Sequence, residues 1–81
     1  MKDKSEVKRK QIAFGSYIRN KRERLNYTQE DMAQLLGLSR VAYLRYESGE
    51  RGMDIDSIVT IANELRFSID DFINQYQKGE L

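Results

Sequence analysis

The chain contains no cysteine and no histidine. It therefore cannot form a disulfide or an ordinary zinc site, and it lacks the side chains of Cys–His and Ser–His–Asp nucleophile systems. No glycine-rich phosphate loop or nucleophile motif is present, and short helices in a chain of 81 residues offer little concave space for acid–base catalysis. We expect no enzyme activity, no catalytic residue, no metal, no cofactor and no small-molecule ligand.

Long apolar runs are also missing. None approaches the roughly 18 residues of a membrane span, and the charged N-terminus is not followed by an apolar signal core. The absence of cysteine fits a reducing compartment. We expect a cytoplasmic protein with no membrane partner, and its length predicts one small domain.

The net charge is only +1, but the charges are unevenly distributed. Residues 1–27 hold nine Lys/Arg against three Asp/Glu, whereas residues 54–81 hold two against six. The middle, residues 28–53, holds three against four. This pattern indicates a basic N-terminal part and an acidic C-terminal part of the domain. The alternative is that charges fall unevenly by chance in a short chain.

Proline is absent, strand-like alternation is absent, and apolar residues recur at spacings of three and four. The pattern predicts an all-α fold of five helices. The first is expected from about Lys10 to Leu25, with Ile12, Phe14, Ile18 and Leu25 facing inward. The expected domain is residues 10–77, with a basic segment at 1–9, flexible or a helical extension, and a tail at 78–81. Almost nothing is expected outside this domain.

Local start and stop signals mark the other four helices. The signals are Thr28 with Asp31 and then Gly37 for the second helix, Ser39 and Gly49 for the third, Asp54 for the fourth, and Ser68 with Asp71 for the fifth. The expected inward residues are Met32, Ala33, Leu35 and Leu36, then Ile55, Ile58, Val59, Ala62 and Leu65, then Ile69, Phe72, Ile73 and Tyr76.

The second and third helices are joined by Gly37-Leu38-Ser39, the length of connection found in a helix-turn-helix. Tyr43 and Tyr46 are three apart and are expected to face inward. The outward side then carries Arg40, Val41, Leu44, Arg45 and Ser48. Arginine can pair with guanine O6 and N7, and an aliphatic side chain can meet the thymine methyl, so this face suits the DNA major groove.

The stretch TQEDMAQLLGLSRVAYLRYESGER, with DIDSIVTIANELRFSIDDFI after it, resembles the Cro/repressor-type helix-turn-helix family of phage and bacterial transcriptional regulators. The resemblance covers roughly residues 12–75. It implies a five-helix repressor-like domain whose third helix, about residues 39–48, is the recognition helix. The chain departs from the family pattern in lacking a proline near Met53 and in having Glu50 where a basic residue would assist a phosphate contact.

The resemblance assigns roles to residues of this chain. Candidates for reading bases are Arg40, Val41, Leu44 and Arg45. Candidates for phosphate contact are Gln29, Ser39, Ser48 and Arg51, while Arg22 and Glu47 match a bracing salt bridge. For each of these exposed positions a plain solvated residue is the alternative, and Arg40 could hold phosphate instead of a base. The segment Lys2 to Lys10 is either an arm that reaches phosphates or a solubilising tail.

The expected function is sequence-specific binding of double-stranded DNA by a homodimer on a pseudo-palindromic operator. The stripe of Ile69, Phe72, Ile73 and Tyr76 is expected to serve mainly the core, with one edge as a dimer interface. Phage-type repressors, controllers of restriction–modification genes and antitoxins all remain open. The alternative function is a protein-interaction module, such as an antitoxin-like partner binder, that retains the fold; exposed Val41 and Leu44 and the small net charge favour it.

Overall fold

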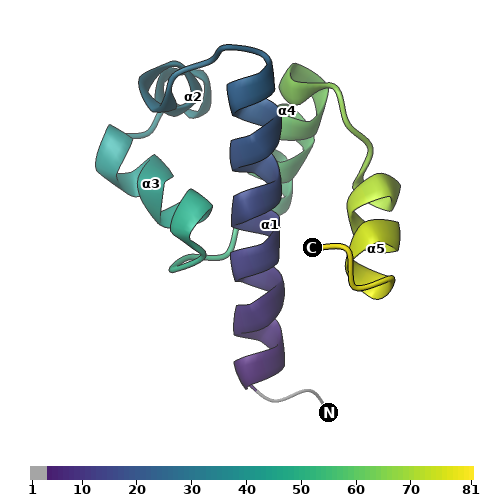
Figure 1. Cartoon of the computed structure of the whole chain (residues 1–81). Helices are drawn as coiled ribbons and strands as arrows, with labels where there is room; N and C mark the ends of the chain where they lie inside the picture. The colour runs from purple at the N-terminus through teal and green to yellow at the C-terminus, as the bar shows by residue number, and fades with distance from the viewer. Residues whose placement is uncertain (1–3) are drawn as a thin grey trace.

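The computed structural model describes residues 4–81, and within that range it contains five helices and no strand (Figure 1). The helices are α1 (Lys4–Arg24), α2 (Gln29–Leu36), α3 (Arg40–Ser48), α4 (Ile55–Leu65) and α5 (Ile69–Gln77). The all-α prediction with five helices is confirmed. No helix in residues 4–81 has the length and apolar character needed to cross a bilayer.

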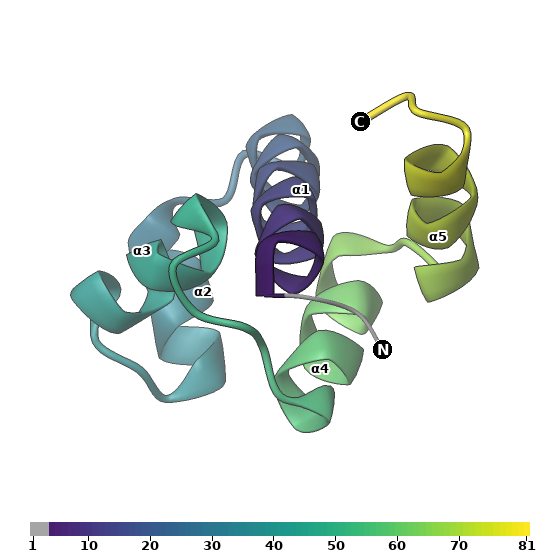
Figure 2. The same ribbon diagram turned by 90° about the horizontal axis from the view of Figure 1, so that it is seen from below.

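The long helix α1 forms the centre of the molecule, with α2 and α3 on one side and α4 and α5 on the other (Figure 1). Viewed along α1, the other four helices are arranged around it (Figure 2). Helix α1 contacts α3, α4 and α5, and α2 contacts α3 and α4. Because α3 packs directly on α1, its position depends on how closely the two helices approach.

The predicted caps form as the sequence indicates. The Thr28 hydroxyl accepts from the Asp31 N–H at 3.0 Å, and the Asp31 carboxylate accepts from the Thr28 N–H at 2.8 Å, which completes a capping box. Gly37 ends α2 in the left-handed conformation with φ 67°. Short-range chemistry therefore sets the boundaries of α2 to α5.

Two of these caps predict how stability depends on pH. Hydrogen bonds from Ser57 hold the pKa of Asp54 below its usual value, and bonds from Thr28 do the same for Asp31. A depressed pKa in the folded state stabilises the fold above the unfolded pKa, near 4, and this contribution is lost as the pH falls through the folded value. We expect the free energy of unfolding, measured by urea titration, to decrease below about pH 4. The decrease should be shallower in Asp54→Asn, which keeps a capping oxygen; equal slopes would contradict the assignment.

The first helix differs from expectation at its start. It begins at Lys4 and not near Lys10, so residues 4–9 form a helical extension and not a flexible segment. Residues 1–3 of the expected basic segment lie outside the described residues. Lys, Glu and Arg favour helix even without packing, which explains why the helix continues although Val7 is 47% exposed.

The predicted inward faces were partly wrong. Ile12 and Leu25 of the first stripe, Leu35 of the second, Ile55 and Val59 of the fourth and Ile73 of the fifth are exposed. The core uses Tyr17, Ile61 and Phe67 instead, which the sequence analysis did not single out. Exposed apolar residues lie where the helix face turns away from α1 or where no neighbouring helix covers it.

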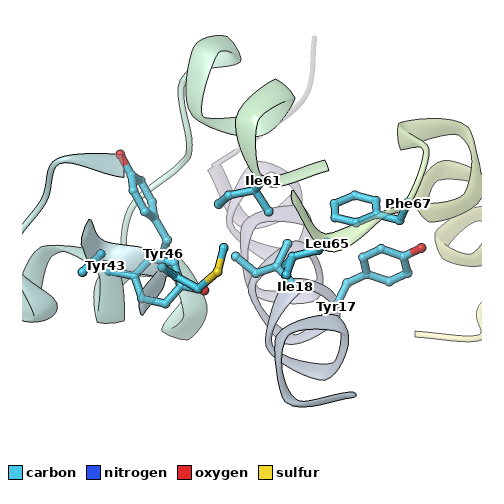
Figure 3. Packing of buried hydrophobic residues seen from close by; sticks show 9 residues of the cluster. Tyr17, Ile18, Tyr43, Tyr46, Ile61, Leu65 and Phe67 are labelled. Atoms are coloured by element: carbon cyan, nitrogen blue, oxygen red, sulfur yellow. The ribbon is translucent and has the colours of Figure 1, made fainter. Parts of the chain in front are cut away.

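The core runs across the molecule from α3 to α5 (Figure 3). Tyr43 and Tyr46 fill the α3 side and are buried, as predicted. Ile18 and Leu65 lie in the middle of the cluster (Figure 3). On the α5 side, aromatic rings meet edge to face at centroid distances of 4.9–6.2 Å, and these rings are Phe14, Tyr17, Phe67 and Phe72. Edge-to-face packing of this kind adds to the stabilisation that burial supplies.

Candidate nucleic-acid interface

The turn between α2 and α3 is built from backbone hydrogen bonds. The N–H of Leu38 donates to the Ala33 carbonyl at 2.8 Å, directly after Gly37. Ser39 then caps α3, its hydroxyl accepting from the Ala42 N–H at 3.1 Å. Ala33 is fully buried, so a larger residue there would push the two helices apart. Ser39, a predicted phosphate candidate, lies exposed at the start of α3 with its oxygen engaged in the cap.

The inner face of α3 is fixed against α1 by aromatic packing and by close backbone contact. Tyr43 is fully buried, and burial raises the pKa of its hydroxyl far above the ordinary value. Gly15 of α1 lies directly against the carbonyl oxygens of Tyr46 and Glu47, at the end of α3. Any side chain at Gly15 would force the helices apart. The sequence analysis missed this residue, although a glycine inside a helical pattern commonly has a packing reason.

The outer face of α3 is accessible. Arg40, Val41, Arg45 and Ser48 are exposed, Val41 to 61%, and Leu44 is half-buried. Two guanidinium groups and an aliphatic side chain are thus available on one side of the helix whose other side is buried. This arrangement can present hydrogen-bond donors and an apolar contact to base edges in a major groove.

A chain of polar contacts connects this face to α1. Arg22 is buried and donates through Nε to Glu47 Oε2 at 2.6 Å and through Nη1 to the Tyr27 carbonyl at 2.8 Å. Gln29 Nε2 donates to the other oxygen of Glu47 at 3.3 Å. Arg40 Nη2 in turn donates to Gln29 Oε1 at 3.3 Å. The buried ion pair therefore holds Gln29, and Gln29 orients Arg40.

The last residue of α3, Ser48, and the segment that follows it carry the remaining phosphate candidates. The Ser48 hydroxyl donates to the Arg45 carbonyl at 3.2 Å, and the Arg51 N–H donates to the same oxygen at 3.2 Å. The Arg51 guanidinium lies 5.5 Å from the centre of the Tyr46 ring, in a cation–π contact. Both side chains are exposed beside the C-terminal end of the recognition helix.

The four dimer candidates on α5 have different environments. Ile69 and Phe72 pack against the core, and Phe72 also stacks on Tyr76 at 5.9 Å. Ile73 alone among them is a large exposed apolar side chain, at 40%. Ile69 and Phe72 are therefore already used within the protomer, and Ile73 is the residue of this set that a second copy could cover.

Comparison with known proteins gives the family. The sequence profile described as Helix-turn-helix matches residues 18–72, which include α2, the turn and α3. The chain belongs to this helix-turn-helix family. It is a family of DNA-binding transcription regulators and not of enzymes.

Relatives of the helix-turn-helix chain are found among curated proteins. It is 36% identical over 63 residues to the cryptic phage CTXphi transcriptional repressor RstR of Vibrio cholerae, a match to 78% of this chain and 56% of the relative. It is 37% identical over 67 residues to the uncharacterized HTH-type transcriptional regulator YqaE of Bacillus subtilis, covering 83% and 54%. The chain thus spans about half the length of these relatives. No solved structure matches it significantly.

Proposed function

We propose that this helix-turn-helix chain is a sequence-specific regulator of transcription that binds DNA as a homodimer. The observation that carries the proposal is the outer face of α3, where Arg40, Val41 and Arg45 are exposed on a helix anchored by buried Tyr43. A regulator needs such a face at a fixed orientation, because base edges are read only when donors are positioned to within hydrogen-bond geometry.

The contacts of the candidate residues support separate roles. Arg40 and Arg45 read bases together with Val41 and Leu44, with Arg40 steered by its bond to Gln29. Ser48 and Arg51 contact the phosphate backbone beside the recognition helix, and Gln29 contacts phosphate at the start of α2. Phosphate contacts supply affinity without sequence information, whereas base contacts supply specificity. The relative from Vibrio cholerae is named a transcriptional repressor, which supports a role in regulation for this chain.

Replacing Arg45 should separate these two roles. Arg45→Ala is expected to weaken operator binding by about 1–3 kcal/mol and to relax the preference at one base-pair position. The measurement is fluorescence anisotropy with the operator duplex and with duplexes that carry each of the three other base pairs at each operator position. Arg66→Ala, which removes an exposed arginine at the end of α4, is the matched control. Equal weakening of Arg45→Ala on every sequence would demote Arg45 to a phosphate contact.

A second copy is expected to pack on α5 at Ile73. One small recognition unit binds weakly, and two copies would place their recognition helices in successive major grooves about 34 Å apart. Ile73→Glu should shift the protein toward monomer in sedimentation at tens of micromolar and weaken operator binding, while its circular dichroism spectrum stays helical. A wild-type protein that is monomeric under these conditions would contradict the homodimer.

The experiment that tests the function as a whole is selection of bound sites from a random double-stranded DNA pool. Enrichment of an inverted repeat would establish direct recognition, and its half-site spacing would report two copies. Failure to enrich any sequence with folded protein at moderate salt would contradict the proposal. The alternative would then be a protein-interaction module that uses Val41, which is 61% exposed, and Leu44 as its contact surface. A pull-down would test this alternative, with Val41→Glu as the variant that should lose the partner.

A further inference from the structure

The face of α1 that packs against α3 continues beyond α3 as a row of lysines. Gly15 lies against the carbonyls at the end of α3. Gln11 approaches Gly52 closely, and its Nε2 atom would be only 2.6 Å from a Cβ added at Gly52. Lys8 and Lys4 precede Gln11 at helical spacings of three and four, so they lie on the same face of α1. Both lysines are exposed.

This lysine face lies next to the segment that follows the recognition helix. Gln11, on the same face of α1 as Lys4 and Lys8, and Arg51 line the same surface hollow, which places this face beside the residues expected to meet the DNA backbone. Figure 1 shows the first turns of α1 extending past the end of α3. The acidic residues nearby include Glu6, on the opposite face of α1, Glu50, next to Arg51, and Asp54, which interacts electrostatically with Arg51; Lys4, Lys8, Arg9, Lys10 and Arg51 outnumber them. Positive charge therefore dominates this part of the surface.

The location of these lysines has a cost for the helix itself. The first turns of a helix favour acidic side chains, because the aligned peptide dipoles make that end positive. Here residues 4–10 carry four basic residues, Lys4, Lys8, Arg9 and Lys10, and one acidic residue, Glu6. The helix dipole therefore does not favour Lys4, and attraction to a polyanion accounts for a lysine at that position.

We infer that Lys4 and Lys8 form a second phosphate-binding strip, which contacts the DNA backbone outside the base pairs read by α3. The inference rests on the proposed function, and it adds a partner surface that helix α3 does not provide. Such contacts are independent of sequence and would enlarge the site covered by each protomer. A helical strip holds its charges in fixed register with α3, which a flexible arm could not do.

The test compares the double variant Lys4→Gln/Lys8→Gln with wild type on the selected operator and on a scrambled duplex. The expected result is about tenfold weaker binding to both DNAs at ~0.1 M salt, and a plot of log affinity against log salt that is shallower by about two. Helix content and melting temperature should be unchanged or higher. The control Arg66→Gln/Lys78→Gln removes two exposed charges at the ends of α4 and α5 and should leave the salt dependence nearly intact.

The outcomes distinguish the strip from the function on which it rests. If wild type prefers the operator and the lysine variant keeps the wild-type salt dependence, the inference about Lys4 and Lys8 is wrong, whereas the proposed function as a DNA-binding regulator is unaffected. If wild type shows no preference for any sequence, the proposed function fails whatever the lysines do. Lysine-dependent binding to vesicles of phosphatidylserine, with DNA binding unchanged, would assign the strip to a membrane surface and overturn the inference.

Discussion

Gly15→Ala is expected to destabilise the protein by about 3 kcal/mol, the upper end of the cost of overpacking a core. An added Cβ would lie 2.5 Å from the Tyr46 carbonyl oxygen and closer still to that of Glu47. These obstacles are backbone atoms, so no side chain can rotate away to make room. Alanine would otherwise stabilise a helix interior by up to about 1 kcal/mol, which makes a loss of stability diagnostic of the contact.

The measurement is the free energy of unfolding from urea titration of wild type and variant. Gly37→Ala is the matched control, because nothing lies within 4 Å of a Cβ there and only the left-handed φ of 67° is strained. It should cost about 1–2 kcal/mol, the price of that conformation. A Gly15→Ala protein as stable as wild type would show that α1 and α3 do not approach as closely as the structure has them.

Gly15 also affects recognition. Helix α3 is held by α1 at its C-terminal end, and its outer face carries the two arginines at fixed positions relative to that contact. A variant that folds with α1 pushed back would present Arg40 and Arg45 at an altered angle. We therefore expect Gly15→Ala to weaken binding to the operator more than binding to a duplex of scrambled sequence, since base contacts tolerate less displacement than phosphate contacts.

The features predicted from sequence are those fixed by neighbours along the chain. The capping box at Thr28 and the left-handed turn at Gly37 depend on residues within a few positions, so the spacing alone located α2 and its turn. The start of α1 had no such cap signal, and it was placed six residues too late. α4 ends at Leu65, and the next residue, Arg66, adopts a left-handed φ of 60° without being glycine.

Features that depend on distant contacts were harder to predict. Helix α4 has apolar residues on more than one side, and only the positions of α1 and α2 decide that Ile61 is buried while Ile55 is exposed. Phe67 follows the turn after α4, and its burial depends on the rings of Phe14 and Tyr17 in α1. The outer face of α3 followed from spacing, but the bond from Arg40 to Gln29 requires the folded arrangement of α2 and α3.

Glu47→Ala is expected to cost about 3–5 kcal/mol, because it leaves the buried guanidinium of Arg22 without its anion. Gln29 Nε2 would lose its acceptor in the same variant. A domain of this size has a total stability of only about 4–12 kcal/mol, so the loss should remove at least about a quarter of that stability and lower the thermal midpoint clearly. The thermal midpoint reports the loss directly, and equal midpoints for wild type and Glu47→Ala would contradict the role of the pair.

The double variant Arg22→Met/Glu47→Leu separates stability from recognition. Replacing both charges by apolar side chains should recover much of the loss, since a buried pair can often be exchanged for hydrophobic packing. It cannot restore the acceptor of Gln29, however, and Gln29 is the residue that orients Arg40. The double variant should therefore be folded but weak on the operator, with scrambled DNA bound nearly as before. Full operator affinity in this stable variant would show that Arg40 reads DNA without support from the buried pair.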